Sequence, residues 1–269
     1  MNPDKIKRLL TKQSSQLETA LYEVRKKKSM ESVHRFRVIY KKTRTLIRIS
    51  KALSGRDSCK MPGPLRKLYH QSGLVRDTGL QLMRINKDSR KLKLADQANF
   101  SSLSQKRKQA WTDFLKRFDE TAITKNIQAM VSCASQQPVK QSINRWMQVR
   151  KYAVQKTVSS GSMRNMGLHV VRKELKDLYY ATLYCKDWKQ KAGRLFGWKI
   201  KDNTIPARLL QDLGDYQDLV LLCGLLHKRN FALFSVNEKK RLRLLSINWQ
   251  AEKKALRNTI MQELKMIFP

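Results

Sequence analysis

The segment VHRFRVIYKKTRTLIRI, residues 33–49, carries a dense run of basic side chains together with enough apolar ones to form a buried helix face. On a helical wheel the cations share one stripe and the apolar groups share the neighbouring one. The stripe spans an arc of about 80°, and its members are spaced alternately three and four residues apart. It consists of His34, Arg37, Lys41, Arg44 and Arg48. Cations at successive helical turns suit an extended polyanion, because Arg can grip two oxygens and Lys supplies a mobile point charge.

The sign of the charges argues against a merely solvated face, which is the simplest alternative. A solvated face usually mixes both signs, but no carboxylate occurs between Glu31 and Asp57. Like charges three and four residues apart repel, so an anionic ligand is expected to offset the repulsion. For His34 alone, a structural imidazole is the alternative to a ligand-facing one. In a ligand-facing role, its expected place near the start of a helix would add positive potential beside a phosphate.

A weaker copy of the stripe occurs in LHVVRKELKDLYYATLY, residues 168–184, where His169, Arg172 and Lys176 repeat the spacing of the first. A second pair of matching segments, LYHQSGLVRDTGL (68–80) and LLQDLGDYQDLVL (209–221), follows in the same order. In that pair Gly73 corresponds to Gly214. Two matches in one order predict an internal duplication, with a first half over residues 1–136 and a second over 137–269.

Helical apolar spacing extends over nearly the whole chain, and no convincing strand pattern flanked by hairpin turns occurs. The sequence therefore predicts an all-α fold of two four-helix halves. A cap at Asn2 and Pro3 in the first turn mark the start of the first helix. The expected helices cover about residues 2–25, 29–53, 64–85, 101–135, 139–158, 163–192, 205–229 and 238–268.

The charge balance is extreme, with 57 Lys and Arg against 21 Asp and Glu, for a formal net charge of +36 on 269 residues. Such self-repulsion favours an abundant anionic partner: inorganic polyphosphate, nucleic acid or an anionic membrane surface. The absence of a signal peptide, a membrane span or a CxxC pair predicts a cytoplasmic protein with reduced, buried thiols. The cysteines are Cys59, Cys133, Cys185 and Cys223.

Catalysis is not expected from this sequence. It contains no GxxxxGK[ST] loop, no HExxH motif and no close carboxylate pair within the basic stripes, so neither a metal site nor a cofactor site is predicted. Asp77 and Asp218 are expected to pair with Arg or Lys and to fix side-chain directions. A membrane-surface helix is also disfavoured, because both faces of the basic helix are expected to be used in bundle packing.

Nucleic-acid binding is the main rival, since the net charge would suit it. Single-strand binders interleave aromatics with their cations, whereas the first stripe has none on its cationic arc and Tyr40 projects toward the apolar side. Tyr179, in the second stripe, is the exception. The other prominent aromatics are expected to be core residues: Trp111, Phe114, Trp146, Trp188 and Trp249.

The motif VHRFRVIYKKTRTLIR followed by LVRDTGL, with its echo LHVVRKELKDLYY and LGDYQDL, resembles the CHAD family, the conserved-histidine α-helical domain. The resemblance covers about residues 3–268 and departs from the family pattern at Asp177 and Tyr179. It implies two four-helix bundles related by a pseudo-twofold axis, a basic cavity between them and non-catalytic binding of inorganic polyphosphate. Association with polyphosphate granules, with protein partners that the sequence does not identify, is one purpose that such binding would serve.

The resemblance also implies a set of anion-binding residues. In the first half they are His34, Arg37, Lys41, Lys42, Arg44 and Arg48, and in the second half His169, Arg172, Lys173 and Lys176. Arg76, Lys67 and Arg208, the repeat equivalent of Lys67, are additional candidates.

Overall fold

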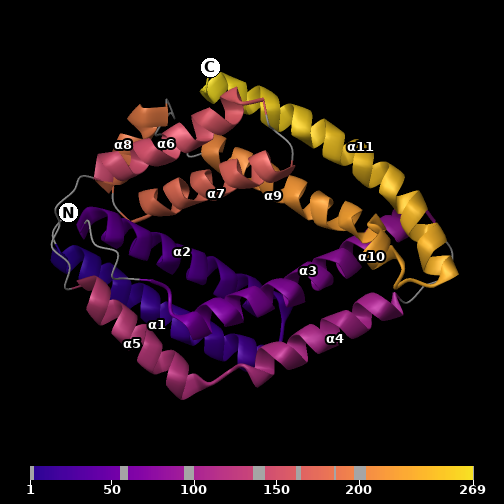
Figure 1. The fold of residues 1–269 in the computed structure, drawn as a ribbon, viewed down its shortest axis with the longest axis horizontal. Coiled ribbons are helices and arrows are strands. Elements are labelled where there is room, and N and C mark those ends of the chain that lie inside the picture. The colour runs from indigo at the N-terminus through magenta and orange to yellow at the C-terminus, as the bar shows by residue number, and fades with distance from the viewer. Residues whose placement is uncertain are drawn as a thin grey trace.

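A computed structural model describes residues 3–54, 60–93, 100–135, 143–161, 165–184, 186–196 and 204–268. Within these ranges every regular element is a helix, which confirms the all-α prediction. The first half contains α1 (Pro3–Lys27), α2 (Met30–Ser54), α3 (Gly63–Lys91), α4 (Ser101–Lys116) and α5 (Glu120–Ser135). The second contains α6 (Ile143–Ser159), α7 (Asn165–Thr182), α8 (Lys186–Phe196), α9 (Thr204–Cys223), the 3₁₀ helix η1 (Gly224–Leu226), α10 (Lys228–Phe231) and α11 (Val236–Ile267). Figure 1 shows the chain passing through the two groups in turn.

Three of the expected helices are interrupted. The helix expected over residues 101–135 is two helices, α4 and α5, because the chain leaves helical conformation at Arg117 and the Asp119 carboxylate accepts a hydrogen bond from the Ala122 backbone N–H at 3.0 Å, starting a new helix. The helix expected to reach residue 192 ends at Thr182 and is followed by α8. The helix expected over 205–229 gives way to η1 at Gly224, a residue that disfavours helix continuation.

Other boundaries differ by less. The helix expected to end at Ile85 continues to Lys91, so α3 is about two turns longer than its apolar pattern indicated. The expected cap at Asn2 and the start of the fifth helix at residue 139 lie outside the described residues, as does the boundary expected between residues 136 and 137.

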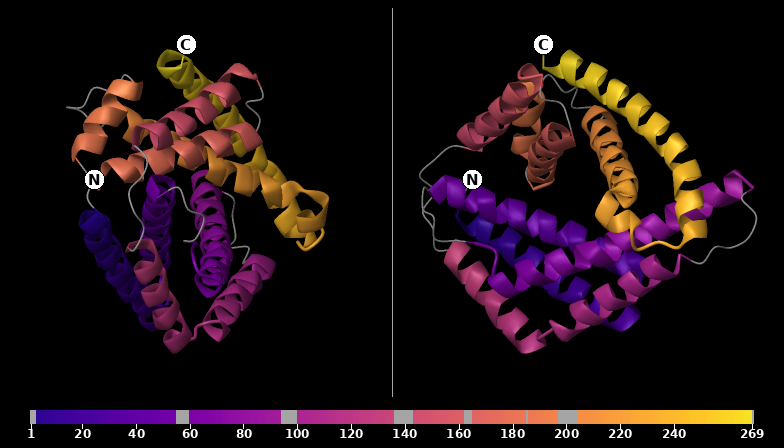
Figure 2. Two further views of the ribbon diagram at one scale, coloured as in Figure 1. Left: turned by 60° about the vertical axis from the view of Figure 1, so that its left-hand side comes forward. Right: turned by 45° about the vertical axis from the view of Figure 1, so that its right-hand side comes forward.

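The two halves repeat one packing pattern. In the first half α1 packs on α2, α2 on α3, and α3 on α4; in the second, α6 packs on α7, α7 on α9, and α9 on α11. The halves meet where α2 packs on α7 and where α3 packs on α9. Figure 2 shows them as two facing layers of helices. This correspondence agrees with the internal duplication inferred from the sequence motifs.

Two clusters of apolar residues join the halves, one between α2 and α7 and the other between α3, α9 and α11. One cluster includes Phe36 and Leu46 of α2 and Val171 and Leu178 of α7, which are all buried. A second cluster brings the end of α3 together with α9 and α11 around Trp249. The expected aromatic core residues are buried, except that Trp111 is only partly so: Phe114, Trp146, Trp188 and Trp249. Because α2 and α7 are anchored by their apolar faces, their cationic stripes are held in fixed positions.

Of the four cysteines, only Cys223 has a side chain that the structure describes. Cys223 is a free, half-buried cysteine, and burial raises the pKa of its thiol. Cys59, Cys185 and the side chain of Cys133 lie outside the described residues.

Candidate anion-binding site

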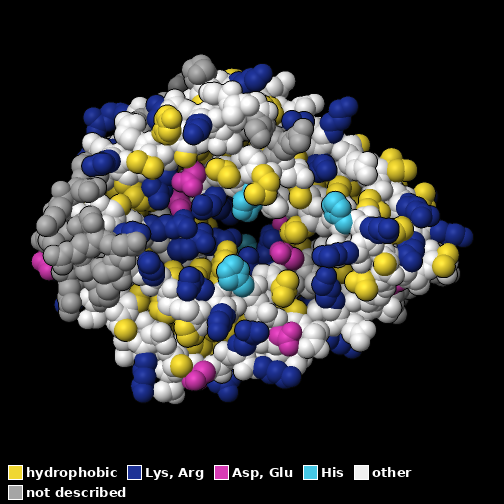
Figure 3. Space-filling model, in the orientation of Figure 1, with side chains coloured by type: hydrophobic (Ala, Val, Ile, Leu, Met, Phe, Trp, Pro, Cys, Tyr) yellow, Lys and Arg dark blue, Asp and Glu magenta, His cyan; other side chains and the backbone are white. Residues whose placement is uncertain are grey.

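Lys41 of α2 lies where cations from the two halves converge. Its amine is largely buried, and burial together with Lys176, Arg37, Arg172 and Arg76 lowers the lysine pKa from 10.5 to about 6. Lys176 and Arg172 belong to α7, so both copies of the stripe contribute to one electrostatic environment. Figure 3 shows a hollow near the middle of the molecule with Lys, Arg and His side chains around it. We call the convergent group the central cationic cluster: His34, Arg37, Lys41, Arg76, Arg172 and Lys176.

Arg37 is fixed by contacts with α3. Its Nη1 donates hydrogen bonds to the Tyr69 carbonyl oxygen at 2.8 Å and to Ser72 Oγ at 3.2 Å. Its guanidinium lies 4.4 Å from the centroid of the Tyr69 ring, which itself stacks on Tyr40. The absence of a side chain at Gly73 permits this approach, because a Cβ there would lie 3.0 Å from Arg37 Nη1.

The second half repeats this arrangement with α7 and α9. Arg172 packs against Gly214, where an added Cβ would lie 3.6 Å from Arg172 Nη2. His169 Nδ1 lies 3.3 Å from Gln217 Oε1. Lys176 is half-buried, and burial followed by Arg172 and Arg76 lowers its pKa to about 8. The Gly73 and Gly214 motifs therefore place equivalent arginines beside α3 and α9.

Several donors of the stripes still lack an acceptor. Within the described part of the chain, the Nε atoms of Arg37, Arg44 and Arg172 are buried without a hydrogen-bond partner. Buried polar groups are usually hydrogen-bonded, so these donors are suited to acceptor oxygens from a ligand or from water.

Arg76 of α3 connects the two halves through its ion pair with Asp218 of α9. Its Nη1 lies 3.1 Å from Asp77 Oδ1, and its Nη2 lies 3.1 Å from Asp218 Oδ1. Asp77 and Asp218 thus pair with an arginine, in the manner expected from the sequence, and orient it beside the central cationic cluster. Part of the charge of Arg76 is offset by this pairing.

Arg48 is engaged more completely than the sequence suggested. It pairs with Asp177 Oδ2 of α7, and Thr45 Oγ1 donates to Asp177 Oδ1 at 2.9 Å. The Asp177 side chain is only 3% exposed. This buried carboxylate of α7 binds two side chains of α2 and so holds the two helices together. Arg48 therefore acts first as a contact between the halves, at the edge of the anion site.

Sequence reasoning did not single out Arg150 of α6, which lies near this pair. Its guanidinium is 3.5 Å from the Trp146 ring centroid, and burial lowers its pKa to about 10 despite the nearby Asp177 and Glu174. Arg150 is one of several basic residues of α6, and their spacing does not repeat the His-Arg-Lys pattern of the stripes.

His34 is more exposed than the other residues of the central cationic cluster. Burial, then Arg76, Lys41, Lys176 and Arg37, lowers the pKa of His34 from 6.5. Without a ligand the neighbouring cations thus favour the neutral imidazole, whereas a bound phosphate would favour the charged one.

The remaining candidates are less enclosed. Lys42 is half-buried, whereas Lys67 and Arg208, near the starts of α3 and α9, are exposed. Arg208 Nε lies 3.7 Å from Glu263, and the exposed Lys173 lies 3.7 Å from Glu174. We place these four residues outside the central cationic cluster.

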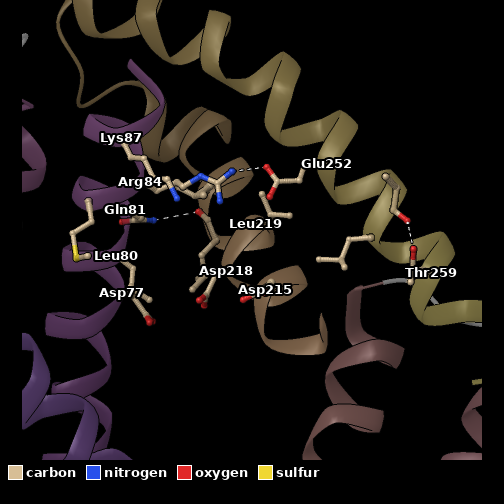
Figure 4. A pocket seen from close by; sticks show the side chains of 15 residues that line it. Asp77, Leu80, Gln81, Arg84, Lys87, Asp215, Asp218, Leu219, Glu252 and Thr259 are labelled. Carbon is tan, nitrogen blue, oxygen red and sulfur yellow. Dashed lines mark hydrogen bonds and ion pairs between the residues drawn. The ribbon is translucent and has the colours of Figure 1, made fainter. Parts of the chain in front are cut away.

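A separate cavity of about 580 Å³ lies beside the cluster, and all its lining residues come from α3, α9 and α11. Figure 4 shows Asp77 and Asp218 at one side and the Arg84–Glu252 ion pair at the other. Much of the lining is leucine, including Leu80, Leu219 and Leu222. Its lining chemistry differs from that of the cationic stripes.

The described residues contain no group of three or more His, Cys, Asp or Glu side chains placed to hold a metal ion. Nor does any helix among them have the length and hydropathy needed to cross a membrane.

The all-helical fold, its two similar halves and the cationic cluster between them are the features to compare with known protein families. The family model described as CHAD domain matches residues 8–227, so the chain belongs to the CHAD family. Among solved structures, PptA from Streptomyces chartreusis has a TM-score of 0.70 at 13% identity, covering 98% of this chain and 99% of that one. The CHAD domain from the plant Ricinus communis has a TM-score of 0.67 at 17% identity, covering 98% and 91% respectively. At these identities the likeness shows a common fold. A search of curated proteins found no significant match.

Proposed function

We propose that this protein binds inorganic polyphosphate in the central cationic cluster, without catalysing its cleavage. The observation that carries the proposal is the burial of Lys41 among cations from both halves; burial first, and then these cations, lowers its pKa to about 6. Holding so many like charges together is unfavourable unless an anion offsets them. A chain of phosphates carries about one charge per unit and only acceptor oxygens, so it complements donors that face one another.

The arrangement favours a chain over a single phosphate. The stripe of α2 offers cations at successive turns, about 5 Å apart along the helix, and α7 adds a second row. The two rows meet at Lys41 and Lys176, whose pKa values each reflect the other half. A flexible polyanion can contact both rows at once, which gives avidity that a monophosphate cannot reach.

The experiment is binding of long-chain polyphosphate, at fixed salt, to the wild type and to a Lys41→Gln/Lys176→Gln double variant. We expect the double variant to bind about tenfold more weakly or worse, because two charge-assisted contacts are removed. The matched control is Lys125→Gln/Lys156→Gln, which removes the same charge from exposed positions on α5 and α6. Equal affinity of the wild type and the double variant for polyphosphate would show that the cluster is not the binding site.

The same titration decides between polyphosphate and nucleic acid. Competition between long-chain polyphosphate and single-stranded or duplex nucleic acid should favour the chain without bases, because the aromatics next to the cluster are already engaged. Tyr40 is buried, and Tyr69 is covered on one side by Tyr40 and contacted by Arg37. A preference for nucleic acid would replace the proposed ligand.

We further propose a cytoplasmic role at polyphosphate granules, where a protein of net charge +36 would meet a dense store of its ligand. Imaging of a fluorescent fusion in cells with and without polyphosphate tests this location. A diffuse signal in both would contradict it.

A further inference from the structure

The outward face of α11 near its start combines exposed aliphatic side chains with basic ones. Val236, Leu244 and Ile247 are 68%, 50% and 66% exposed. At 100° per residue they lie within about 80° of one another; the exposed Lys240 lies inside this arc, and the exposed Arg243 lies about 20° beyond its edge. We call these residues the α11 outer stripe: Val236, Lys240, Arg243, Leu244 and Ile247.

This stripe lies opposite the face that packs in the fold. Leu242, Leu245 and Trp249 are fully buried in the second core cluster, on the other side of the helix. The stripe is therefore not needed for bundle packing. Between Val236 and Ala251, α11 has one acidic residue, Glu238, and it is buried.

The surface is held rigidly at its end. Ser235 and Glu238 form a reciprocal capping box that starts α11, and Ser102 Oγ donates to the Leu233 carbonyl oxygen at 2.7 Å. Leu233 itself is 61% exposed and lies two residues before the cap residue Ser235. Figure 1 shows α10 and the start of α11 together at one end of the molecule, and Figure 3 shows hydrophobic and basic side chains intermingled at that end.

We propose that the α11 outer stripe docks the protein on the surface of an anionic lipid bilayer. Aliphatic side chains flanked by Lys and Arg match the interface of such a bilayer, where hydrocarbon lies directly beneath anionic headgroups. The stripe extends for about 16 Å along the helix, so it would lie in the plane of the interface. Nucleic acid fits less well, because bases stack on aromatic rings and the stripe offers Val, Leu and Ile. This inference is independent of the proposed polyphosphate site.

The test is co-sedimentation of the full chain with vesicles of phosphatidylcholine alone and of phosphatidylcholine with phosphatidylserine. The wild type should bind the second and not the first. Ile247→Ser should weaken binding about tenfold through lost apolar burial, and Lys240→Gln about fivefold through lost charge. The matched control is Val149→Ser/Lys156→Gln, which changes an exposed valine and lysine on one face of α6 and should bind as the wild type does.

Two further arms separate this surface from the cationic cluster. The Lys41→Gln/Lys176→Gln variant should keep its vesicle binding, and the stripe variants should keep their affinity for long-chain polyphosphate. Unchanged vesicle binding by the stripe variants, or equal loss in the α6 control, would overturn the proposal. So would stripe variants that lose affinity for duplex DNA while keeping vesicle binding, which would assign the stripe to nucleic acid.

Discussion

Raising the pH from 6 to 8 is expected to weaken polyphosphate binding, because the amine at the centre of the cationic cluster loses its proton. The pKa of Lys41 is about 6 and that of Lys176 about 8 in the unliganded protein, mainly because of burial. Bound phosphate oxygens favour the charged ammonium, so each pKa is higher in the complex. Affinity is therefore greatest below the unliganded pKa and is lost as the pH rises toward the pKa of the complex.

The size of the effect follows from proton linkage. One group titrating between its two pKa values changes affinity by at most tenfold per pH unit. For Lys41 the ceiling from pH 6 to 8 is about 100-fold, and we expect about tenfold because residual water contact screens the charges. Lys176 adds to the loss near and above pH 8.

The assay is calorimetric titration at pH 7 with long-chain polyphosphate, in two buffers that differ in ionisation enthalpy. The difference in observed heat measures proton uptake, which should be about half a proton per protein, because a tenfold change in affinity over two pH units corresponds to an average uptake of about 0.5 proton. Long chains keep the contribution of terminal phosphates small. Lys41→Gln should abolish most of this uptake.

His34 is the competing source of a pH response. Its pKa is lowered by burial and by the cluster cations, so its free form loses its proton below pH 6.5. His34→Gln should therefore leave most of the change in affinity between pH 7 and 8 intact. Proton uptake of zero in the wild type, or full uptake in Lys41→Gln, would refute the reasoning.

Three further outcomes concern stability, each measured by denaturant unfolding of the unliganded protein at pH 7. Lys41→Met should stabilise the protein by about 1–3 kcal/mol while weakening polyphosphate binding, because it removes an amine that burial holds away from its preferred charged form; a less stable variant would contradict this. Asp177→Ala should cost about 3–5 kcal/mol, since it leaves a partly buried arginine and a buried threonine without their acceptor; a loss below about 1 kcal/mol would show that the pair is dispensable. Gly214→Ala should stabilise by up to about 1 kcal/mol through helix propensity. Gly73→Ala should gain less and weaken polyphosphate binding, because its Cβ would press on Arg37 at 3.0 Å; identical behaviour of the two glycine variants would count against this contact.

The sequence was sufficient for the helical class and for the stripes, because both depend on local periodicity. His34, Arg37 and Lys41 share one face of any helix built from residues 33–49. Phe36 and Leu46 share the neighbouring face for the same reason, and both are buried. The family resemblance and the repeated glycines also pointed to the correct fold, since each half places an arginine of the stripe against its glycine.

Helix ends were less predictable, because apolar spacing continues across breaks that depend on caps and packing. The new helix after the break begins with one capping hydrogen bond to Asp119. The Asp119-Glu120 pair is typical of a helix start and could have indicated this break from the sequence. The end of α7 at Thr182 carried no comparable signal.

The residues alone determined that the chain is helical and strongly basic, with cations aligned on one face of each histidine-bearing helix, and they predicted two related halves. Only the tertiary structure decided which cations meet. Lys41 and Lys176 lie 135 positions apart, and Lys176 helps to lower the pKa of the buried Lys41 because α2 packs on α7. The same packing brings Arg48 to Asp177. Helical periodicity had placed Arg48 in the anion-binding stripe, but its guanidinium binds this buried carboxylate of α7.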